Sequence, residues 1–541
     1  MEKSDILNLK SEMTWVLTLD IGTSSLRAML FDAAAQPTGA EVQIRYEMHT
    51  TADGGVEADP DEMFEHACHA MDQILAAAGP DAQSIKAVGS DSLVGNILGV
   101  DAAGRAVTPV YTYADTRAAR EVTELRARFD ERAVHQRVGT FFHTSYLPAR
   151  FLWLARAHPD LLARSRWWMS LGEYFLFRWL GRRVCSFSVA SWTGLLNRQE
   201  LAWDRELVAA LPISVEQLSP LSDFDTPLHG LVPEFAGRWP VLNSAAFFPT
   251  VGDGAAANLG SGCVNPTQIA LTVGTSSAMR VVLPGPTSPH SPNPLSPPLL
   301  GEGRGGKGVG GEVPTEGGER GLGVRGEVPP GLWAYRVDKN DELIGGALNE
   351  GGSLYAWMES TLRLDDATKT EAELEALAPD AHGLTVLPFL AGERAPGWVS
   401  DARADILGLS LNTRPIEILR AGLEAVAYRL DLVFELLRTV APNAHEVIAS
   451  GGALMHSPVW TQIIADVLGA PVIASGEPEA TSRGIALLAL KGLGVINRME
   501  DLPARLGVSF LPDAGRHEIY TQAVKRQQKW YNLLIKEKPT T

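Results

Sequence analysis

The sequence contains few cysteines, and those it has are far apart. Cys68, Cys185 and Cys263 are the only three in 541 residues, and no CxxC pair or Cys/His cluster accompanies them. This spacing excludes a disulfide framework and a structural zinc site, and it is typical of a reducing compartment. We therefore expect a cytoplasmic protein.

The sequence also lacks a long apolar run and an excess of basic residues. No stretch supplies the about 20 continuous apolar residues that a membrane span needs. The formal net charge is −17 and the isoelectric point is about 5.2, which disfavours non-specific binding to nucleic acid or to an anionic membrane. We expect a soluble, non-secreted protein that binds neither nucleic acid nor membrane.

What the sequence does have is length and apolar content. At 541 residues, of which 45% are hydrophobic, the chain is too long for one ordinary core. Two domains of roughly 200 to 250 residues each are expected. We place the boundary between residues 1–262 and residues 263–541.

One short motif occurs twice, near the start of each half. Residues 22–25 and residues 274–277 both read Gly-Thr-Ser-Ser, and each lies between two apolar runs. This pattern predicts a β-hairpin whose backbone N–H groups and hydroxyls can donate to phosphate oxygens without any lysine. A single copy could equally be a solvated turn. The duplication favours a pair of phosphate-binding loops.

A carboxylate accompanies each of these hairpins. Asp20 lies two residues before the first glycine, where it could hold a metal-bound water or simply stabilise the turn. Asp253 lies between Gly252 and Gly254, so that its carboxylate can project into a cleft with little obstruction. An aspartate in a tight turn or at a helix N-cap would look the same.

The two hairpins, together with Gly252-Asp253-Gly254, resemble the FGGY family of sugar kinases, which have the actin-like ATPase fold. The resemblance implies an α/β fold of two ribonuclease-H-like domains with an active-site cleft between them. It implies ATP and Mg²⁺ as cofactors and a small sugar or sugar acid as substrate. It also implies that Asp253 is the general base that accepts the proton of the substrate hydroxyl. Whether the protein forms a homodimer is left open by the resemblance.

A second resemblance concerns the sugar-binding region. Residues 111–117, Tyr-Thr-Tyr-Ala-Asp-Thr-Arg, look like the family's Trp-x-Asp-x-Arg motif with Tyr113 in place of tryptophan. In the alternative, Asp115 caps the following helix and Arg117 pairs with a neighbouring acid. His143 could lie over the pocket mouth or be a solvated loop residue. The predicted substrate-binding residues are Tyr113, Asp115, Arg117, His143 and Ser92.

The nucleotide is expected at glycine-rich turns of both halves. Residues 445–453 predict a strand followed by a Gly-Gly turn and resemble the family's adenosine motif, and Gly352 opens a helix whose amino end could face phosphate or ribose. The predicted metal ligand is Asp20. The predicted nucleotide-binding residues are Gly22, Thr23, Ser24, Ser25, Arg27, Gly274, Thr275, Ser276, Gly352, Gly451, Gly452 and Ala453.

Two other glycine motifs are rejected. Residues 252–257 fit a dinucleotide fingerprint, but no acidic residue follows before residue 302 to bind the ribose. Residues 301–307 match a P-loop up to its lysine, but Gly308 replaces the hydroxyl residue that would bind magnesium. Residues 301–307 belong to a low-complexity insert, residues 284–330, which we predict to be a disordered excursion that spares the core.

The resemblance is greatest to gluconate kinases, which implies phosphorylation of D-gluconate to 6-phosphogluconate. Many gluconate- and xylulose-type members carry a Met-His pair where this sequence has Val94-Gly95. Xylulose or another polyol therefore remains an alternative substrate. A noncatalytic actin-like ATPase or chaperone is the alternative from another functional class.

Overall fold

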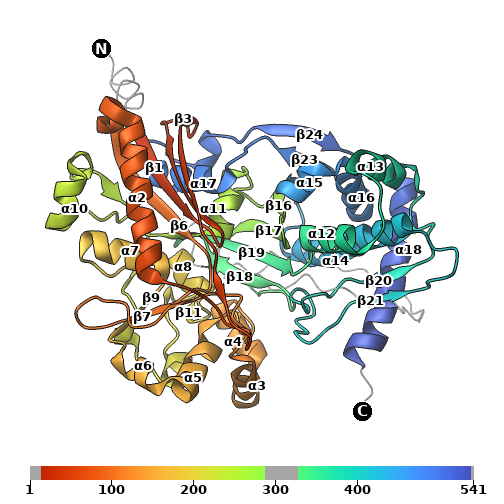
Figure 1. Cartoon of the computed structure of the whole chain (residues 1–541), viewed down its shortest axis with the longest axis horizontal. Helices are drawn as coiled ribbons and strands as arrows, with labels where there is room; N and C mark the ends of the chain where they lie inside the picture. The colour runs from red at the N-terminus through yellow and green to blue at the C-terminus, as the bar shows by residue number, and fades with distance from the viewer. Residues whose placement is uncertain (1–13, 287–326, 538–541) are drawn as a thin grey trace, which may run out of the picture.

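The computed structural model describes residues 14–286 and 327–537, which form two α/β lobes side by side (Figure 1). Each lobe has a twisted sheet with helices packed on it. The main helices of the first lobe are α2 (Pro60–Ala78), α3 (Ala119–Arg128), α4 (Glu131–Val138), α5 (Leu147–Ala157), α7 (Leu171–Leu180), α8 (Phe187–Trp192) and α11 (Asp253–Gly260). The main helices in the later part of the chain are α12 (Gly352–Thr361), α13 (Ala367–Ala376), α14 (Pro415–Val440), α15 (Gly452–His456), α16 (Pro458–Leu468), α17 (Ala480–Gly492) and α18 (Ala514–Tyr531).

The first sheet consists of β1 (Trp15–Ile21), β2 (Ser25–Phe31), β3 (Pro37–Arg45), β6 (Ile85–Ser92), β14 (Ala246–Phe247) and β15 (Val251–Gly252). Its order is β14-β6-β1-β2-β3, and β15 also pairs with β6. The hairpin β1–β2 is antiparallel, whereas β6 runs parallel to β1. Because side chains alternate along a strand, Leu17 and Leu19 pack toward α2 while Val16 packs on the opposite face.

The second sheet repeats this arrangement. It consists of β16 (Gln268–Val273), β17 (Ser277–Pro284), β18 (Trp333–Arg336), β19 (Asp341–Leu348), β22 (Glu446–Ser450), β23 (Val472–Ser475) and β24 (Leu506–Phe510), in the order β18-β19-β17-β16-β22-β23-β24. The antiparallel hairpin β16–β17 again lies beside a parallel strand, β22. The duplicated sequence motif therefore occupies the same place in both lobes, at the tip of the first hairpin.

Helix α17 joins the two halves of the chain, because it comes late in the sequence but packs on the first sheet. Its Ile485 and Leu488 share an apolar cluster with Val16 of β1. It crosses α11 in backbone contact: a Cβ added at Gly484 would lie 1.9 Å from the carbonyl oxygen of Ala256. No side chain larger than hydrogen fits at this crossing, so the position of α11 depends on α17.

A second junction lies between α8 and β18. The ring of Trp192 stacks on Tyr335 with centroids 3.9 Å apart. Arg198 donates from one guanidinium nitrogen to both carboxylate oxygens of Glu342 at 3.0 and 2.9 Å, and the side chains of both residues are almost completely buried. A buried ion pair of this kind is costly to break, because either partner alone would be a buried unpaired charge.

Most of the long elements lie where their sequence patterns predict them. The apolar spacing of residues 63–78 and of residues 416–437 predicts a helix in each, and the structure has α2 and α14 there. The aromatic-rich spacing of residues 167–180 predicts a single helix, and this prediction is wrong in its first part, because Trp167–Met169 form strand β9. Ser170 and Glu173 form a capping box that starts α7 only after this strand.

The predicted disordered excursion falls largely outside the described residues, as does the rejected P-loop match at residues 301–307. Its residues 284–286 and 327–330 are described. Val328 is fully buried, and its backbone N–H donates to the side chain of Gln136 at 2.9 Å. The chain therefore rejoins the core at residue 328.

Among the described residues, no helix is long and apolar enough to cross a membrane.

Candidate active site

Three aspartates lie close together at the carboxyl ends of neighbouring parallel strands. In the register of the first sheet, Leu19 of β1 is opposite Ser90 of β6, and Val251 of β15 is opposite Asp91. Asp20 and Asp91 therefore project from the same face and the same edge of the sheet. Asp253 follows two residues after Val251. We call Asp20, Asp91 and Asp253 the aspartate cluster.

The pKa values of all three members of the aspartate cluster are raised, in each case chiefly by burial. Burial raises the pKa of Asp253 to about 6, with a further rise from Asp20, while the N–H of Gly254 and Arg280 act in the opposite direction. Burial also raises the pKa of Asp91 well above its usual range, and Asp20 and Asp253 add to this rise. The pKa of Asp20 is raised by burial against the opposing effect of Arg27. Such perturbed carboxyls are typical of a functional site.

Asp253 is the first residue of α11 and is partly exposed. The backbone N–H of Gly254 donates to its Oδ1 at 2.6 Å. The flanking glycines are required because Trp192 packs against both of them: a Cβ at Gly252 or Gly254 would lie 2.9 or 3.0 Å from the indole ring. The glycines thus let the turn carry the carboxylate past the indole.

Tyr113 and Arg394 interact electrostatically with Asp253, and Arg394 also acts on His143. Burial, and then the charge of Asp253, raises the pKa of Tyr113, while Arg394 opposes that rise. Burial and then Arg394 lower the pKa of His143 to about 3, so its imidazole is neutral at physiological pH. The Nδ1 of His143 accepts from the backbone N–H of Ser145 at 3.2 Å. Nε2 is therefore the protonated nitrogen.

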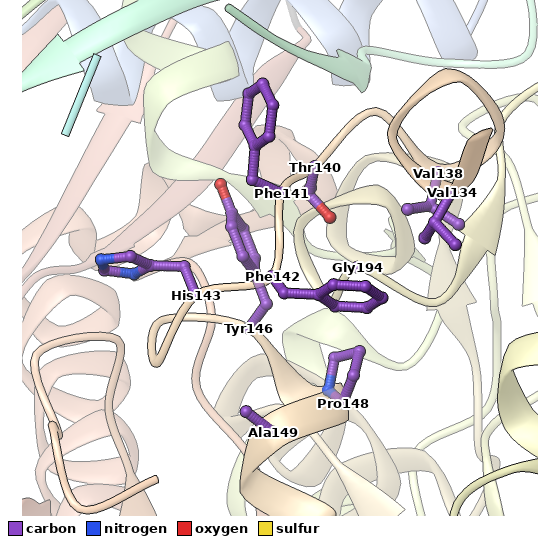
Figure 2. Close-up of a pocket in the computed structure, with 10 residues that line it drawn as sticks. All are labelled: Val134, Val138, Thr140, Phe141, Phe142, His143, Tyr146, Pro148, Ala149 and Gly194. Carbon is purple, nitrogen blue, oxygen red and sulfur yellow. The ribbon is translucent and has the colours of Figure 1, made fainter. Parts of the chain in front are cut away.

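Figure 2 shows the loop that carries His143, whose imidazole points to the opposite side from the ring of Phe142. Phe142 is buried, whereas His143 approaches the ring of Trp398 edge-on, with centroids 5.7 Å apart. The gap that Phe142 and its neighbours enclose is too narrow to hold a water molecule. This gap is therefore a packing defect and not a ligand site.

Arg117 forms the ion pairs of the alternative interpretation, but Asp115 does not cap the following helix, whose N-cap residue is Ala118. Oδ1 of Asp115 accepts from both the backbone N–H and Nε of Arg117, each at 3.1 Å. The same guanidinium pairs with Glu57 and lies 4.5 Å from the ring centroid of Trp153. Arg117 is thus already neutralised by two carboxylates inside the protein.

Ser92 is not brought to the aspartate cluster. It is the neighbour of Asp91 in β6, so its side chain points to the other face of the sheet. There its hydroxyl accepts from the side-chain amide of Asn96 at 3.2 Å and is buried. The residue of this strand that faces the cluster is Asp91.

The predicted nucleotide residues of the second lobe converge. The N–H groups of Gly352 and Ser353 donate to the carbonyl oxygens of Gly274 and Thr275 at 2.7 and 3.0 Å. Gly451, at φ 102°, packs so closely on β16 that an added Cβ would lie 2.3 Å from the oxygen of Val273. The hairpin, the start of α12 and the Gly-Gly turn therefore form one surface, although the N–H of Gly352 is already used by the hairpin.

The first hairpin presents its hydroxyls to solvent. Thr23 and Ser24 are exposed, as are Thr275 and Ser276 in the second hairpin. The hydroxyl of Tyr46 donates to the oxygen of Gly22 at 2.6 Å and holds the first loop in place. Arg27 differs from the prediction that it reaches phosphate, because it forms ion pairs with Glu41, at 3.1 Å, and with Glu479.

Sequence reasoning missed Asp91, Arg280 and Arg394 as site residues. Arg280 donates to the hydroxyl of Thr272 at 3.3 Å, and its Nε, like that of Arg394, is buried without a described partner. The charge on Arg394 influences the pKa of Asp253, Tyr113 and His143. A signal existed for Asp91, since an aspartate near the end of a buried strand is unusual. Nothing local marked Arg280, whereas Arg394 belongs to a Glu-Arg pair whose sequence fits a contact with substrate and a stabilising role at the domain junction equally well.

The fold and the cluster at its junction define a two-domain kinase of the actin-like ATPase class. A gluconate kinase from Lactobacillus acidophilus superimposes with a TM-score of 0.84 at 22% identity, covering 97% of this chain and 99% of the other. A xylulose kinase from the same organism superimposes with a TM-score of 0.82 at 23% identity, covering 96% and 98%.

The models of the FGGY family of carbohydrate kinases match residues 15–260 with the N-terminal domain and residues 323–493 with the C-terminal domain, so this chain belongs to that family. It is similar to the gluconokinases of Bacillus licheniformis (26% identity, 96% of this chain and 95% of that protein) and Bacillus subtilis (24%, 92% and 91%). It also resembles a glycerol kinase of Rhodopseudomonas palustris (27%, 89% and 91%).

The predicted fold, family and enzyme class are therefore confirmed. The chain is a carbohydrate kinase, a phosphotransferase with an alcohol group as acceptor, and as a member of this family it uses ATP as the phosphate donor. Its acceptor is a small sugar molecule. This sets aside the alternative of a noncatalytic actin-like ATPase.

Proposed function

We propose that this kinase transfers the γ-phosphoryl group of ATP to a hydroxyl of a sugar acid, D-gluconate, with Asp253 as the general base. The position of Asp253 is the observation that carries the proposal. Its carboxylate interacts electrostatically with Asp20, next to the first phosphate hairpin, and with Tyr113 and Arg394, and Arg394 in turn acts on His143. A carboxylate placed between a phosphate site and a polar pocket can take the proton of an attacking hydroxyl.

The protonation state of Asp253 suits this role. With a pKa of about 6 it is ionised at neutral pH, yet it is a stronger base than an ordinary aspartate. Arg280 and the N–H of Gly254 stabilise its charge. Placing such a base contributes on the order of 10²- to 10⁴-fold in rate.

The residues at the phosphate side fit a magnesium ion. Mg²⁺ prefers oxygen ligands, and the aspartate cluster supplies carboxylate oxygens, one of them buried without a described donor. Asp20 is the residue that we assign to hold it. When bound, Mg²⁺ would neutralise charge on the β- and γ-phosphates of ATP. The hydroxyls and backbone N–H groups of residues 22–25 and 274–276 would bind the phosphates, and the turn at Gly451 would bind adenosine.

A sugar acid is favoured because the cationic side chain of Arg394 acts on both Asp253 and Tyr113. Arg117, one of the predicted substrate-binding residues, is not free to pair with a substrate carboxylate, because its guanidinium pairs with Asp115 and Glu57. Arg394 is the better partner, since its Nε has no described acceptor. The gluconokinases among the relatives agree with this choice.

The alternative substrate is xylulose or another polyol. Xylulose kinases superimpose nearly as well as the gluconate kinase, and glycerol kinases lie within the same range of identity. The departure at Val94 lies close to the reaction centre: a Cβ at Gly252 would be 3.2 Å from Cγ1 of Val94. We also propose that the protein is cytoplasmic and forms a homodimer. The three cysteines are free and buried, which is consistent with reduced thiols in the cytoplasm.

A panel of sugars and sugar acids, scored for ADP release, tests the substrate. We expect D-gluconate to give the highest kcat/KM, and we expect Arg394→Met to raise its KM by about 10- to 100-fold, the range for a lost charge-assisted hydrogen bond. The KM for uncharged sugars should change much less. Arg438→Met, which removes an exposed arginine paired with Glu435, is the matched control. A higher kcat/KM for xylulose than for gluconate would decide for the alternative.

A further inference from the structure

Asp91 is a buried carboxyl that the mechanism above does not use. Its side chain is completely inaccessible to solvent. Oδ1 accepts from the backbone N–H of Ile21 at 2.8 Å, which fixes the carboxyl across the gap between β6 and β1. Oδ2 has no hydrogen-bond donor among the described residues. A buried carboxylate oxygen without a partner is costly, and such groups call for a ligand or a functional explanation.

The surroundings of Asp91 are acidic. The charged groups that act on it most strongly are Asp20 and Asp253, and the carboxyl of Asp20 lies within hydrogen-bonding reach. The basic side chain that acts on Asp20, Arg27, forms ion pairs with Glu41 and Glu479. Two carboxylates this close need either a shared proton or a cation between them.

We propose that Oδ2 of Asp91 is a second protein ligand, beside Asp20, for the magnesium ion that accompanies ATP. The inference rests on the proposed function as a Mg²⁺-dependent kinase. Three features support the proposal. Oδ2 of Asp91 has no hydrogen-bond donor among the described residues, and Asp91 lies at the sheet edge next to the first phosphate hairpin. The N–H of Ile21 donates to Oδ1, so this bond does not occupy Oδ2. Hard divalent cations are bound by just such carboxylate oxygens.

The site then differs from one that relies on a single aspartate. With Asp20 and Asp91 as ligands, the ion is held by two neighbouring strands of a rigid sheet. Asp253, which begins a helix on the far side of Asp91, is left free to accept a proton. The three carboxyls thus divide between metal binding and base catalysis.

Binding of Mn²⁺ in the presence of ADP, followed by electron paramagnetic resonance, tests the proposal without turnover. Asp91→Asn keeps the acceptor for Ile21 but loses the anionic oxygen, so we expect its Mn²⁺ affinity to fall at least about tenfold. ADP affinity in EDTA should be unchanged. Asp223→Asn is the matched control: Asp223 is also buried with one unpaired oxygen, but its neighbours are Lys339 and Asp338.

An Asp91→Asn protein that binds Mn²⁺ within twofold of the wild type would overturn the inference, and Asp91 would then be a buried acid that shares a proton with Asp20. Asp91→Ser, smaller and neutral, serves as the second variant if the asparagine protein is not folded, with the same expected loss. Wild-type protein with ADP that binds no Mn²⁺ would also overturn it. Failure of the proposed function is seen separately, as an absence of sugar-stimulated ADP release by the wild type.

Discussion

Asp253→Asn should abolish phosphoryl transfer and, at the same time, make the protein more stable. Asparagine has the shape of aspartate and can still accept from the N–H of Gly254, but it cannot accept a proton from the substrate. We expect kcat to fall by about 10²- to 10⁴-fold while nucleotide binding is retained. The gain in stability follows from burial of the wild-type charge.

The size of this gain comes from the pKa of Asp253. Folding raises it from an ordinary 3.8 to about 6, so the folded protein binds the proton more tightly than the unfolded chain does. Ionisation therefore costs stability as pH rises from about 4 to about 6, and the cost is constant above that. At about 1.4 kcal/mol per pKa unit, the variant should gain up to about 3 kcal/mol at pH 7.5 and about half of that at pH 5.

Urea unfolding of both proteins in EDTA, at pH 5.0 and pH 7.5, measures this difference. Asp223→Asn is the control, because burial and Asp338 also raise the pKa of Asp223 to about 6. It should gain stability in the same way and keep its activity. An Asp253→Asn protein that is inactive and less stable than the wild type at pH 7.5 would refute the reasoning, because the fold would then favour the charged carboxylate. Turnover at the wild-type rate would refute the assignment of the base.

Three further outcomes are expected. The kcat/KM of the wild type should rise with pH to a plateau with an apparent pKa of about 6, because Asp253 must be ionised; a flat profile from pH 5 to pH 8 would count against this. Gly484→Ala should lower the free energy of unfolding by about 1–3 kcal/mol and also lower kcat, because the added Cβ would lie 1.9 Å from the oxygen of Ala256 and push α11 away. The control is Gly237→Ala, which has open space around the added Cβ and should lower neither quantity. Glu424→Ala should lower the free energy of unfolding by about 3–5 kcal/mol, as it leaves Arg420 buried without its ion-pair partner at 2.7 Å; melting at the wild-type temperature would contradict this.

The sequence by itself determined the features that depend on neighbours along the chain. Turn chemistry is local, so the Gly-Thr-Ser-Ser hairpins and the turn around Asp253 could be predicted from a few residues each. Apolar periodicity is also local, and it located long helices such as α14. The same reasoning failed at residues 167–169, where a capping serine, more than the aromatic spacing, decides the helix start.

Only the tertiary structure decided which side chains meet. The pairing of β6 with β1 and β15 turns Asp91 toward Asp20 and Ser92 away from it, and a shift of one residue in that register would have exchanged them. Whether Arg117 is free depended on Glu57, a residue from a distant segment, and the approach of Arg394 depended on the packing of the second lobe on the first. Such contacts join residues far apart in the chain, and no local pattern specifies them.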